Sequence, residues 1–239
     1  TFIDLYKDGL IYKGERITNW CPRCATALSD LEVRYSEEEG FLYEIEYRYA
    51  DGDGGVTIAT TRPETMLGDA AVAVNPTDRR FEHIQGKNVL IPIADREVPI
   101  IHDLSVDVDF GTGALKVTPG HDPTDFEIGL RHKLPTYIVM NLDGSMNENA
   151  GRFRGLNRFD CRSKVVDLLE QSGNLKSSHR YRHSVGHCDR CSEIVEPILT
   201  NQWYVSMKPL AEPALEAVID GRIKIIPDRF KGVYFNWME

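Results

Sequence analysis

Two short stretches of the sequence concentrate side chains that can do chemistry. The first runs from Ala59 to Gly68 and brings together three hydroxyls, one guanidinium and one carboxylate, from Thr60, Thr61, Arg62, Glu64 and Thr65. Polar groups that follow a strand commonly bind ligands, because loops at strand ends are where binding residues gather. Thr and Glu can also cap a helix, so capping explains this stretch equally well by itself.

The second stretch runs from Gly111 to Glu127 and repeats the pattern of a short strand, a Pro-Gly break and a helix start. Asp122 followed by Pro123 is typical of an N-cap with proline at the first helical position. One helix start cannot occupy both Asp122 and Asp125. The stretch therefore holds more polar groups than capping requires, namely Lys116, Thr118, His121, Asp122 and Asp125.

Two cysteine pairs have the spacing of zinc knuckles, Cys21-Pro22-Arg23-Cys24 and Cys188-Asp189-Arg190-Cys191. If one zinc ion binds Cys21, Cys24, Cys188 and Cys191, the intervening chain is an insertion into a zinc ribbon, and four thiolates make the ion structural. Unligated thiols are one alternative. Disulfides are a weaker one, because nothing in the sequence indicates secretion. Cys161 is expected to be a small residue of the protein core, located on a helix, and His187 to be a neighbour of the knuckle rather than a replacement ligand.

The elements that must position these stretches are mostly short strands. Leu31–Tyr35 and Phe41–Tyr49 are predicted strands joined by a turn at Ser36–Gly40, and the second strand alternates with one buried face. The strand at Val56–Ala59 leads into the first polar stretch. Further strands are predicted at 70–74, 88–93, 97–101, 137–140 and 203–207.

Helices are predicted at 2–12, 77–84, 123–132, 161–171 and 210–219, and the polar segment 147–157 is expected to be a mobile loop. Many short strands with a few helices indicate an α/β fold that is rich in strands and barrel-like. At 239 residues, the chain is long enough to bury a sizeable core.

The sequence resembles the editing (CP1) domain inserted into class I valyl-tRNA synthetases in Thr60–Thr65, Gly111–Ala114 and Gly120–Asp125. Met66–Pro76 also has the valyl pattern, and the resemblance covers nearly the whole chain. Leucyl and isoleucyl relatives share this plan. A leucyl enzyme is expected to have Asp at position 64, and an isoleucyl enzyme a Trp-containing segment there, so Glu64 favours the valyl type.

The resemblance implies a β-barrel-like editing domain with short helices, inserted into a zinc-ribbon-like base. We expect residues 1–34 to be a connective segment with the first knuckle, 35–178 the editing domain, and 179–239 the second knuckle and the return toward a catalytic domain. The ATP-binding signatures of the parent enzymes, His-x-Gly-His and Lys-Met-Ser-Lys-Ser, are absent from the sequence. Ligase activity is therefore not expected of this chain.

The function implied by the resemblance is post-transfer editing, which is the hydrolysis of threonyl-tRNA(Val). Valine and threonine are nearly isosteric, so the apolar synthetic pocket of such an enzyme rejects threonine only weakly. A polar editing site has the opposite preference. Lys116, Thr118 and Asp122 can bind the threonine hydroxyl, whereas a valine methyl group leaves them unpaired.

Each step of ester hydrolysis has candidate residues. The resemblance assigns the substrate's α-ammonium group to Asp125, and the cations Arg62 and Lys116 suit the terminal phosphate or the developing oxyanion. No Ser/His or Cys/His nucleophile pair is evident, so we expect direct attack by water on a positioned ester, helped by the free hydroxyl of the terminal ribose. The expected catalytic residues are Asp125, Thr61, Thr65 and Lys116, with the two threonines setting pocket size and placing water. The expected substrate-binding residues are Arg62, Glu64, Thr118, His121 and Asp122, with His121 equally suited to bracing its loop.

The composition limits the partners of the chain. With 28 Lys and Arg against 37 Asp and Glu, the net charge of −9 lacks the footprint of a duplex-binding protein. Arginine clusters such as that at 152–158 are expected on solvated faces. No apolar run reaches the ~18 residues of a membrane span and no signal peptide opens the chain, so we expect a cytoplasmic monomer. Its expected partners are the 3′ acceptor end of tRNA(Val) carrying threonine and the remainder of a longer synthetase chain.

Two alternatives stay open. A zinc-tied domain of this kind could bind the acceptor end of tRNA without catalysis, with its polar stretches serving only as caps. The chain could also edit with leucyl-type or isoleucyl-type specificity, although Pro123-Thr124 agrees with the valyl pattern.

Overall fold

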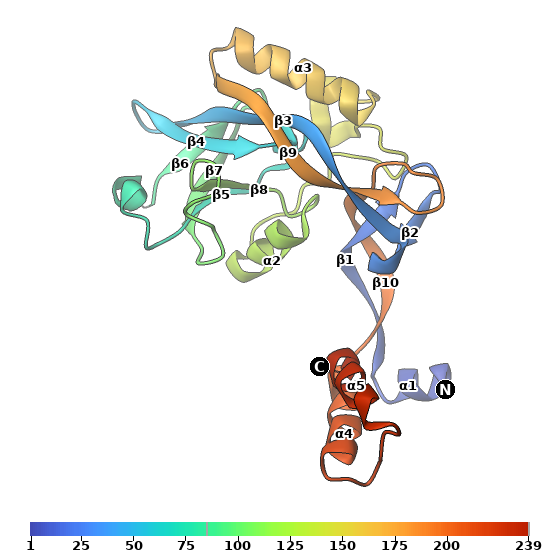
Figure 1. The fold of residues 1–239 in the computed structure, drawn as a ribbon. Helices are drawn as coiled ribbons and strands as arrows, with labels where there is room; N and C mark the ends of the chain where they lie inside the picture. The colour runs from blue at the N-terminus through green and yellow to red at the C-terminus, as the bar shows by residue number, and fades with distance from the viewer. Residues whose placement is uncertain (85, 239) are drawn as a thin grey trace. The chain divides into compact units, whose positions relative to one another are not determined.

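The computed structural model describes residues 1–84 and 86–238. It divides into two compact units, one formed by Ile17–Thr200 and the other by Thr1–Arg16 together with Asn201–Glu239. The larger unit contains both polar stretches and all the cysteines. Figure 1 labels the helices and strands of the chain.

A curled sheet of seven strands dominates the larger unit. Its strand order is β4-β3-β6-β7-β5-β8, with β9 paired to β3, and β4 and β8 at the two ends of this path lie against each other. β5 pairs parallel with β7, whereas β3, β4, β6, β8 and β9 make antiparallel pairs. The strands are β3 (Val33–Tyr49), β4 (Gly55–Thr60), β5 (Ala71–Val74), β6 (Asn88–Ile91), β7 (Arg96–His102), β8 (Ala114–Val117) and β9 (Leu175–Cys188). The expected strand-rich α/β class is thus present, and the sheet that was expected to be barrel-like is a curled sheet.

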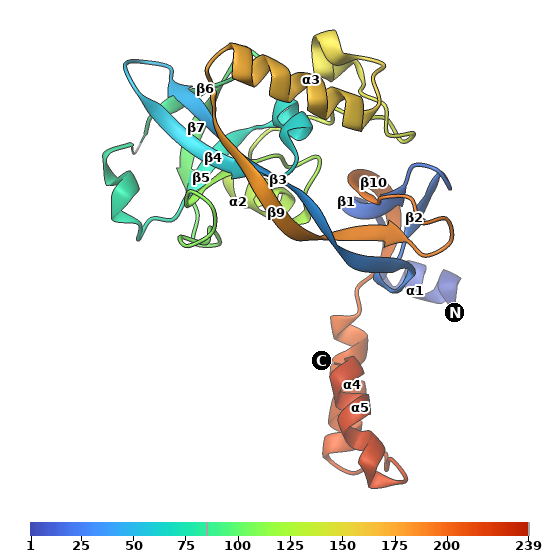
Figure 2. The ribbon, with the colours of Figure 1, turned by 45° about the horizontal axis from the view of Figure 1, so that its top comes forward.

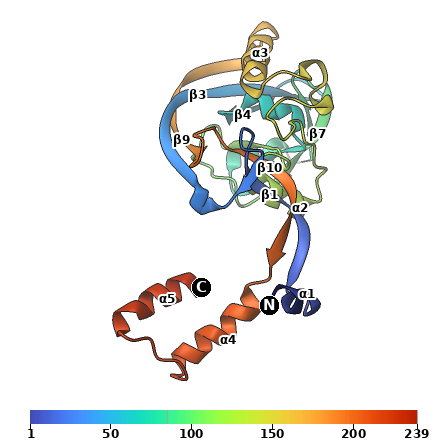
Figure 3. The same ribbon diagram turned by 90° about the vertical axis from the view of Figure 1, so that its right-hand side faces the viewer.

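The turn predicted at Ser36–Gly40 is wrong, because these residues lie inside the long strand β3. Strand β9, which the sequence pattern did not reveal, pairs with β3 from Val33 to Ile45 and supplies the backbone partners that make the polar run extended. The predicted buried face of this strand also differs, because Leu42 is buried while Phe41 is exposed. A register shift in the pairing with β9 lies between Glu44 and Ile45. Figure 3 shows β3 curving along its length beside β9.

Strand β5 is buried on both faces, and its neighbours explain why. Val72 and Val74 join the main core, together with Ile45, Ile58 and Val165. Ala71 and Ala73 point to the other face and pack with Val117 and Ile128. Alternate residues of a strand face opposite sides, so two cores require an apolar residue at every position of β5.

Two α-helices cover the two faces of the sheet (Figure 2). The helix α2 (Pro123–His132) packs on β8, and its N-cap Asp122 accepts hydrogen bonds from the backbone of Thr124 and Asp125, as expected. The helix α3 (Arg158–Gln171) contacts β9 and the short helix η2 (Pro63–Gly68). It starts three residues before the predicted position because Asn157 caps it, and it buries Cys161 in the core as expected.

Two predictions for the segment between these helices are wrong. Residues 137–140 form an isolated bridge between Met140 and Met146 rather than a strand. The expected loop at 147–157 contains the 3-10 helix η4 (Glu148–Phe153). Its N-cap residue Asn147 accepts a hydrogen bond from the Asn149 backbone at 2.9 Å and donates one to the Ile138 carbonyl at 2.8 Å. The polar side chain that indicated a loop is therefore hydrogen-bonded to the backbone.

The helix predicted at 77–84 is the 3-10 helix η3 (Arg79–Ile84).

The chain around the cysteines is also built from strands. The predicted helix at 2–12 ends early as α1 (Phe2–Lys7), because Gly9 has a positive φ of 73° and the chain then extends into β1 (Ile11–Cys21). A three-stranded sheet has the order β10-β1-β2, with β2 at Thr26–Leu28 and β10 at Glu196–Val205. The 3-10 helix η1 (Asp30–Glu32) links β2 to β3.

The smaller unit contains two further helices, α4 (Lys208–Ile219) and α5 (Lys231–Met238), with the 3-10 helix η5 (Asp228–Phe230) before α5. The Tyr234 hydroxyl donates to the Ala214 carbonyl at 2.9 Å and joins the two helices. Within the described residues, no helix has the length and apolar character needed to span a membrane.

Candidate functional site

The two polar stretches meet because β5 and β8 pair in antiparallel register. Ala71 lies opposite Val117, so η2 before β5 and Thr118 after β8 come to the same edge of the sheet. Glycine at position 68 permits this close approach, because a Cβ there would lie 3.2 Å from the Thr118 methyl carbon and 2.7 Å from the Tyr137 carbonyl oxygen.

An open pocket of about 310 Å³ lies at this edge. It is lined by eight of the nine predicted site residues, namely Thr61, Arg62, Thr65, Lys116, Thr118, His121, Asp122 and Asp125. Glu64 is the exception, because its side chain is fully buried in an ion-pair network beside the pocket. The fold therefore gathers residues from two distant stretches at one site.

Lys116 is at the centre of a buried hydrogen-bond network. Its ammonium group donates to the hydroxyl of Thr65 at 2.8 Å and to that of Thr118 at 2.6 Å. Its third neighbour is the Asp69 carboxylate, 3.5 Å away. These contacts compensate the burial of a charge that is only 7% exposed.

Asp69 was not predicted as part of the site. Both of its carboxylate oxygens accept hydrogen bonds, from Tyr47 at 2.7 Å and from Thr118 at 2.5 Å. Burial raises the pKa of Asp69, and the nearby charge of Lys116 opposes that rise. A signal existed in the sequence, because Asp69 directly precedes the apolar run Ala70–Val74, and an Asp that is buried with such a run needs a partner.

Asp125 presents a buried carboxylate to the pocket. One oxygen, Oδ2, accepts a 2.8 Å hydrogen bond from the Thr118 backbone, and no described protein group donates to Oδ1. Burial, and next the negative charge of Asp122, raises the pKa of Asp125 to about 7. The group can therefore bind a cation as a carboxylate above that pH.

His121 is placed as a brace. Its Nε2 accepts a 2.9 Å hydrogen bond from the Val139 backbone, so the proton of the neutral ring is on Nδ1. Burial, followed by the charges of Arg62 and Lys116, lowers the pKa of His121 to about 3. A neutral ring whose lone pair is already occupied is poorly suited to serve as a general base.

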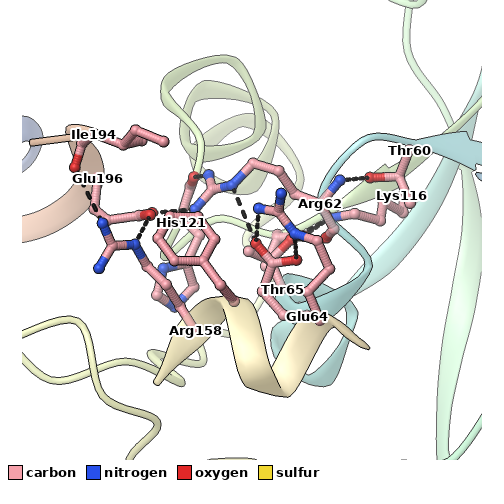
Figure 4. Close-up of polar contacts among 12 residues, drawn as sticks. Thr60, Arg62, Glu64, Thr65, Lys116, His121, Arg158, Ile194 and Glu196 are labelled. Atoms are coloured by element: carbon pink, nitrogen blue, oxygen red, sulfur yellow. Dashed lines mark hydrogen bonds and ion pairs between the residues drawn. The ribbon is translucent and has the colours of Figure 1, made fainter. Parts of the chain in front are cut away.

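Arg62 lies within a network of buried charges (Figure 4). Its guanidinium donates to the His121 carbonyl at 3.0 Å and to the Glu196 carboxylate, and its Nε lies 3.6 Å from Glu64. Burial would raise the pKa of Glu64, but hydrogen bonds from Arg162 hold it below its usual value. Arg62 thus positions the loop as well as lining the pocket.

Three members of this network were not predicted as site residues. Arg162 pairs with Glu64, and Arg158 Nε lies 2.7 Å from Glu196, whose pKa is raised by burial against the opposing charges of Arg62 and Arg158. The expectation of a solvated face is wrong for Arg158, which is 2% exposed. The four-residue spacing of Arg158 and Arg162 on one helix face was the only signal, and it does not name their partners.

A second groove of about 450 Å³ adjoins the pocket and shares Thr61, Arg62 and Asp122 with it. Phe159 and His183 line its far part, so residues of α3 and β9 extend the site beyond the first pocket. Thr61 lines both hollows and is half-buried.

The four predicted metal ligands, Cys21, Cys24, Cys188 and Cys191, come together although 170 residues separate the outermost pair. Their sulfur atoms lie within 4.8 Å of one another. A tetrahedral zinc ion with Zn–S bonds of about 2.3 Å would require sulfurs about 3.8 Å apart, so the donor set fits zinc. His187 lies apart as a neighbour, because its Nε2 contacts Glu38 at 2.7 Å and its Nδ1 contacts the Ser192 carbonyl.

The chain belongs to the class I tRNA synthetases of the I, L, M and V group, whose family model matches residues 1–239. It is similar to the valine–tRNA ligases of Carboxydothermus hydrogenoformans, with 55% identity over 99% of this chain, and of Dehalococcoides mccartyi strain 195, with 58% over 100%. The enzyme of Halalkalibacterium halodurans is 53% identical over 100% of the chain. The chain spans 27% of the length of each of these relatives.

Among solved structures, a LeuRS–tRNA–LeuAMS ternary complex from Agrobacterium radiobacter K84 is similar, with a TM-score of 0.48 and 17% identity. The match covers 82% of this chain and 35% of that one.

Proposed function

We propose that this chain hydrolyses the aminoacyl ester of threonyl-tRNA(Val) and is an editing module of a valyl-tRNA synthetase. The observation that carries this proposal is the pocket in which a buried Asp125 carboxylate lies beside the network of Lys116, Thr65 and Thr118. A small ligand with both an ammonium and a hydroxyl group matches these partners. Threonine has that chemistry, and valine lacks the hydroxyl.

The chemistry follows from positioning. The free Oδ1 of Asp125 binds the α-ammonium group of the ester and thereby fixes the carbonyl carbon in the pocket. Lys116 adds positive charge near the developing oxyanion, and Thr61 and Thr65 bound the space in which water attacks. Because His121 is neutral and its Nε2 is occupied, attack by water without a histidine base is the consistent route.

The segments around the cysteines are the proposed structural base of the editing domain. We propose that Cys21, Cys24, Cys188 and Cys191 bind a structural zinc ion, and that residues 1–34 and 179–239 form a zinc-ribbon-like base for the editing domain at 35–178. Four thiolates fill a tetrahedral shell, so the ion stabilises the fold without taking part in hydrolysis. The acceptor end of tRNA(Val) and the remainder of the synthetase are the proposed partners in the cytoplasm, and ligase activity is not expected of this chain.

Release of threonine from threonyl-tRNA(Val), compared with release of valine from valyl-tRNA(Val), tests the proposal. Asp125→Ala should abolish threonine release, whereas Asp53→Ala, which removes an exposed carboxylate in a surface turn, should leave it unchanged. Release that survives Asp125→Ala would remove Asp125 from the ammonium site. Faster release of valine or isoleucine from their esters than of threonine would favour an isoleucyl-type or leucyl-type specificity, because each type of editing site spares its own amino acid.

The second candidate function is binding of the acceptor end without catalysis. A threonyl ester of adenosine distinguishes the two, because it needs no contact with the body of the tRNA. If this small ester binds but is not hydrolysed, the chain is a binding module.

A further inference from the structure

Asp69 lies directly behind the pocket wall without lining the pocket. Its side chain is fully buried and is enclosed by Tyr47, Lys116 and Thr118. Its backbone carbonyl accepts a 2.8 Å hydrogen bond from Arg96, which also donates to the Leu67 carbonyl. The carboxylate is therefore fixed from several directions, although no step of the proposed hydrolysis uses it.

The hydrogen bonds around Asp69 have a direction that the chemistry of the groups dictates. An ammonium group only donates and a carboxylate only accepts. The hydroxyl of Thr118 lies between the two, so it accepts from Lys116 and donates its own proton to Asp69. The hydroxyl of Thr65 likewise accepts from Lys116 and donates to the Arg62 carbonyl at 2.9 Å.

Both hydroxyl protons are consequently turned away from the pocket. Thr118 and Thr65 can offer only a remaining oxygen lone pair to a ligand, and the nearby Asp125 carboxylate also only accepts. A ligand hydroxyl can donate its proton to the oxygens of Thr118, Thr65 or Asp125. A ligand group that can only accept hydrogen bonds finds no donor among these three side chains.

We propose that Asp69 is a specificity-determining positioning residue that orients the Thr118 hydroxyl and thereby selects substrates whose side chain donates a hydrogen bond. This inference rests on the proposed function for the identity of the substrate. It states that the site recognises the threonine hydroxyl by the hydrogen bond that this hydroxyl donates. Asp69→Asn keeps the shape of the side chain but introduces N–H donors. Thr118 can then turn its proton into the pocket, and the preference for a donor is lost.

The test compares three esters on tRNA(Val): threonyl, valyl and 2-amino-3-fluorobutyryl, in which fluorine replaces the hydroxyl. Fluorine is close to a hydroxyl in size but cannot donate. Rates are divided by the uncatalysed rate of each ester, because fluorine activates the carbonyl. The unaltered chain should release the fluoro compound at least about tenfold more slowly than threonine, since the pocket acceptors stay unpaired. Equal release of the two would overturn the inference without any variant.

The variants separate orientation from stability. Asp69→Asn should bring the threonyl-to-fluoro ratio close to one. Tyr47→Phe removes a hydrogen bond from the same carboxylate but leaves its charge facing Thr118, so the ratio should stay as in the unaltered chain. The amide of the Asp69→Asn variant keeps one acceptor oxygen, so Asp69→Leu, which keeps no acceptor, is measured beside it. An unchanged ratio in both variants, each measured below its melting temperature, would overturn the proposal.

Failure of the proposed function has a different signature. If the unaltered chain releases no ester, editing by this chain is wrong, and calorimetric binding of the 3′-amide analogues of adenosine decides the inference. Tighter binding of the threonyl amide than of its fluoro counterpart supports the orientation of Thr118, and equal binding overturns it.

Discussion

Arg162 donates two hydrogen bonds, each 2.7 Å long, to the two carboxylate oxygens of Glu64, which lies 98 residues earlier in the chain. Glu64 belongs to η2 and Arg162 to α3, so this pair joins the helix above the sheet to the loop that forms the pocket wall. Glu64 is fully buried, and its role in the structure is to hold that loop.

Replacing Glu64 by Gln should destabilise the chain strongly. The substitution leaves the Arg162 guanidinium without its buried counter-charge, which costs about 3–5 kcal/mol of unfolding free energy. Urea unfolding followed by circular dichroism measures the loss. Glu39→Gln is the matched control, because its pair with Arg180 is exposed and contributes about 0–1 kcal/mol. Equal effects of the two substitutions would contradict the structural role of Glu64.

The pH dependence of threonine release should follow the protonation of the Asp125 carboxylate. Its pKa is raised to about 7, so protonation below that pH removes the carboxylate that binds the ammonium group, and the rate above background should fall. Asp122→Asn keeps an N-cap oxygen but removes the like charge, so the acidic limb of the profile should move to lower pH. A profile that does not move would exclude Asp122 as a cause of the shift.

The same raised pKa has a consequence for stability. The native state holds the Asp125 proton more tightly than the unfolded state, so the carboxyl's contribution to stability is present below pH 3.8 and is lost as the pH rises to about 7. Asp125→Asn should therefore stabilise the chain relative to the unaltered sequence more at pH 8 than at pH 4. Thermal melts at the two pH values measure this, and a reversed order would contradict the shift.

Removal of zinc should unfold the chain around the cysteines. We expect one zinc ion per chain by metal analysis, and its loss in Cys188→Ser together with a lower melting temperature, because metal binding contributes directly to folding. Cys161→Ala serves as control, since Cys161 is a core residue of α3 and should leave the zinc content unchanged. Full zinc content in Cys188→Ser would exclude the four-cysteine site.

His121 should prove structural. His121→Leu leaves the Val139 N–H without an acceptor and should cost about 1–3 kcal/mol of stability. Threonine release per folded molecule should stay within a few-fold of the unaltered chain. A loss of about 100-fold or more in a folded variant would instead identify a general base.

Local patterns predicted the elements whose causes are local. The N-cap at Asp122, the helix α2 and the buried strand before η2 follow from neighbouring residues alone. The turn predicted at Ser36–Gly40 is wrong because the partner strand β9 lies about 140 residues away in the chain. A polar run becomes a strand only when another strand supplies its hydrogen bonds. The strand predicted at 137–140 failed for the converse reason. It has an apolar pattern, but among residues 1–84 and 86–238 its pairing is limited to an isolated bridge.

The sequence by itself determined which residues gather at the pocket, since eight of the nine predicted residues line it, and it determined which four cysteines come together. Only the tertiary structure decided what each side chain does there. Glu64 became a buried partner of Arg162, His121 a brace, and Asp69 the acceptor that orients Thr118. The physical reason is that burial and hydrogen-bond direction depend on neighbours from distant parts of the chain, and local spacing carries no information about them.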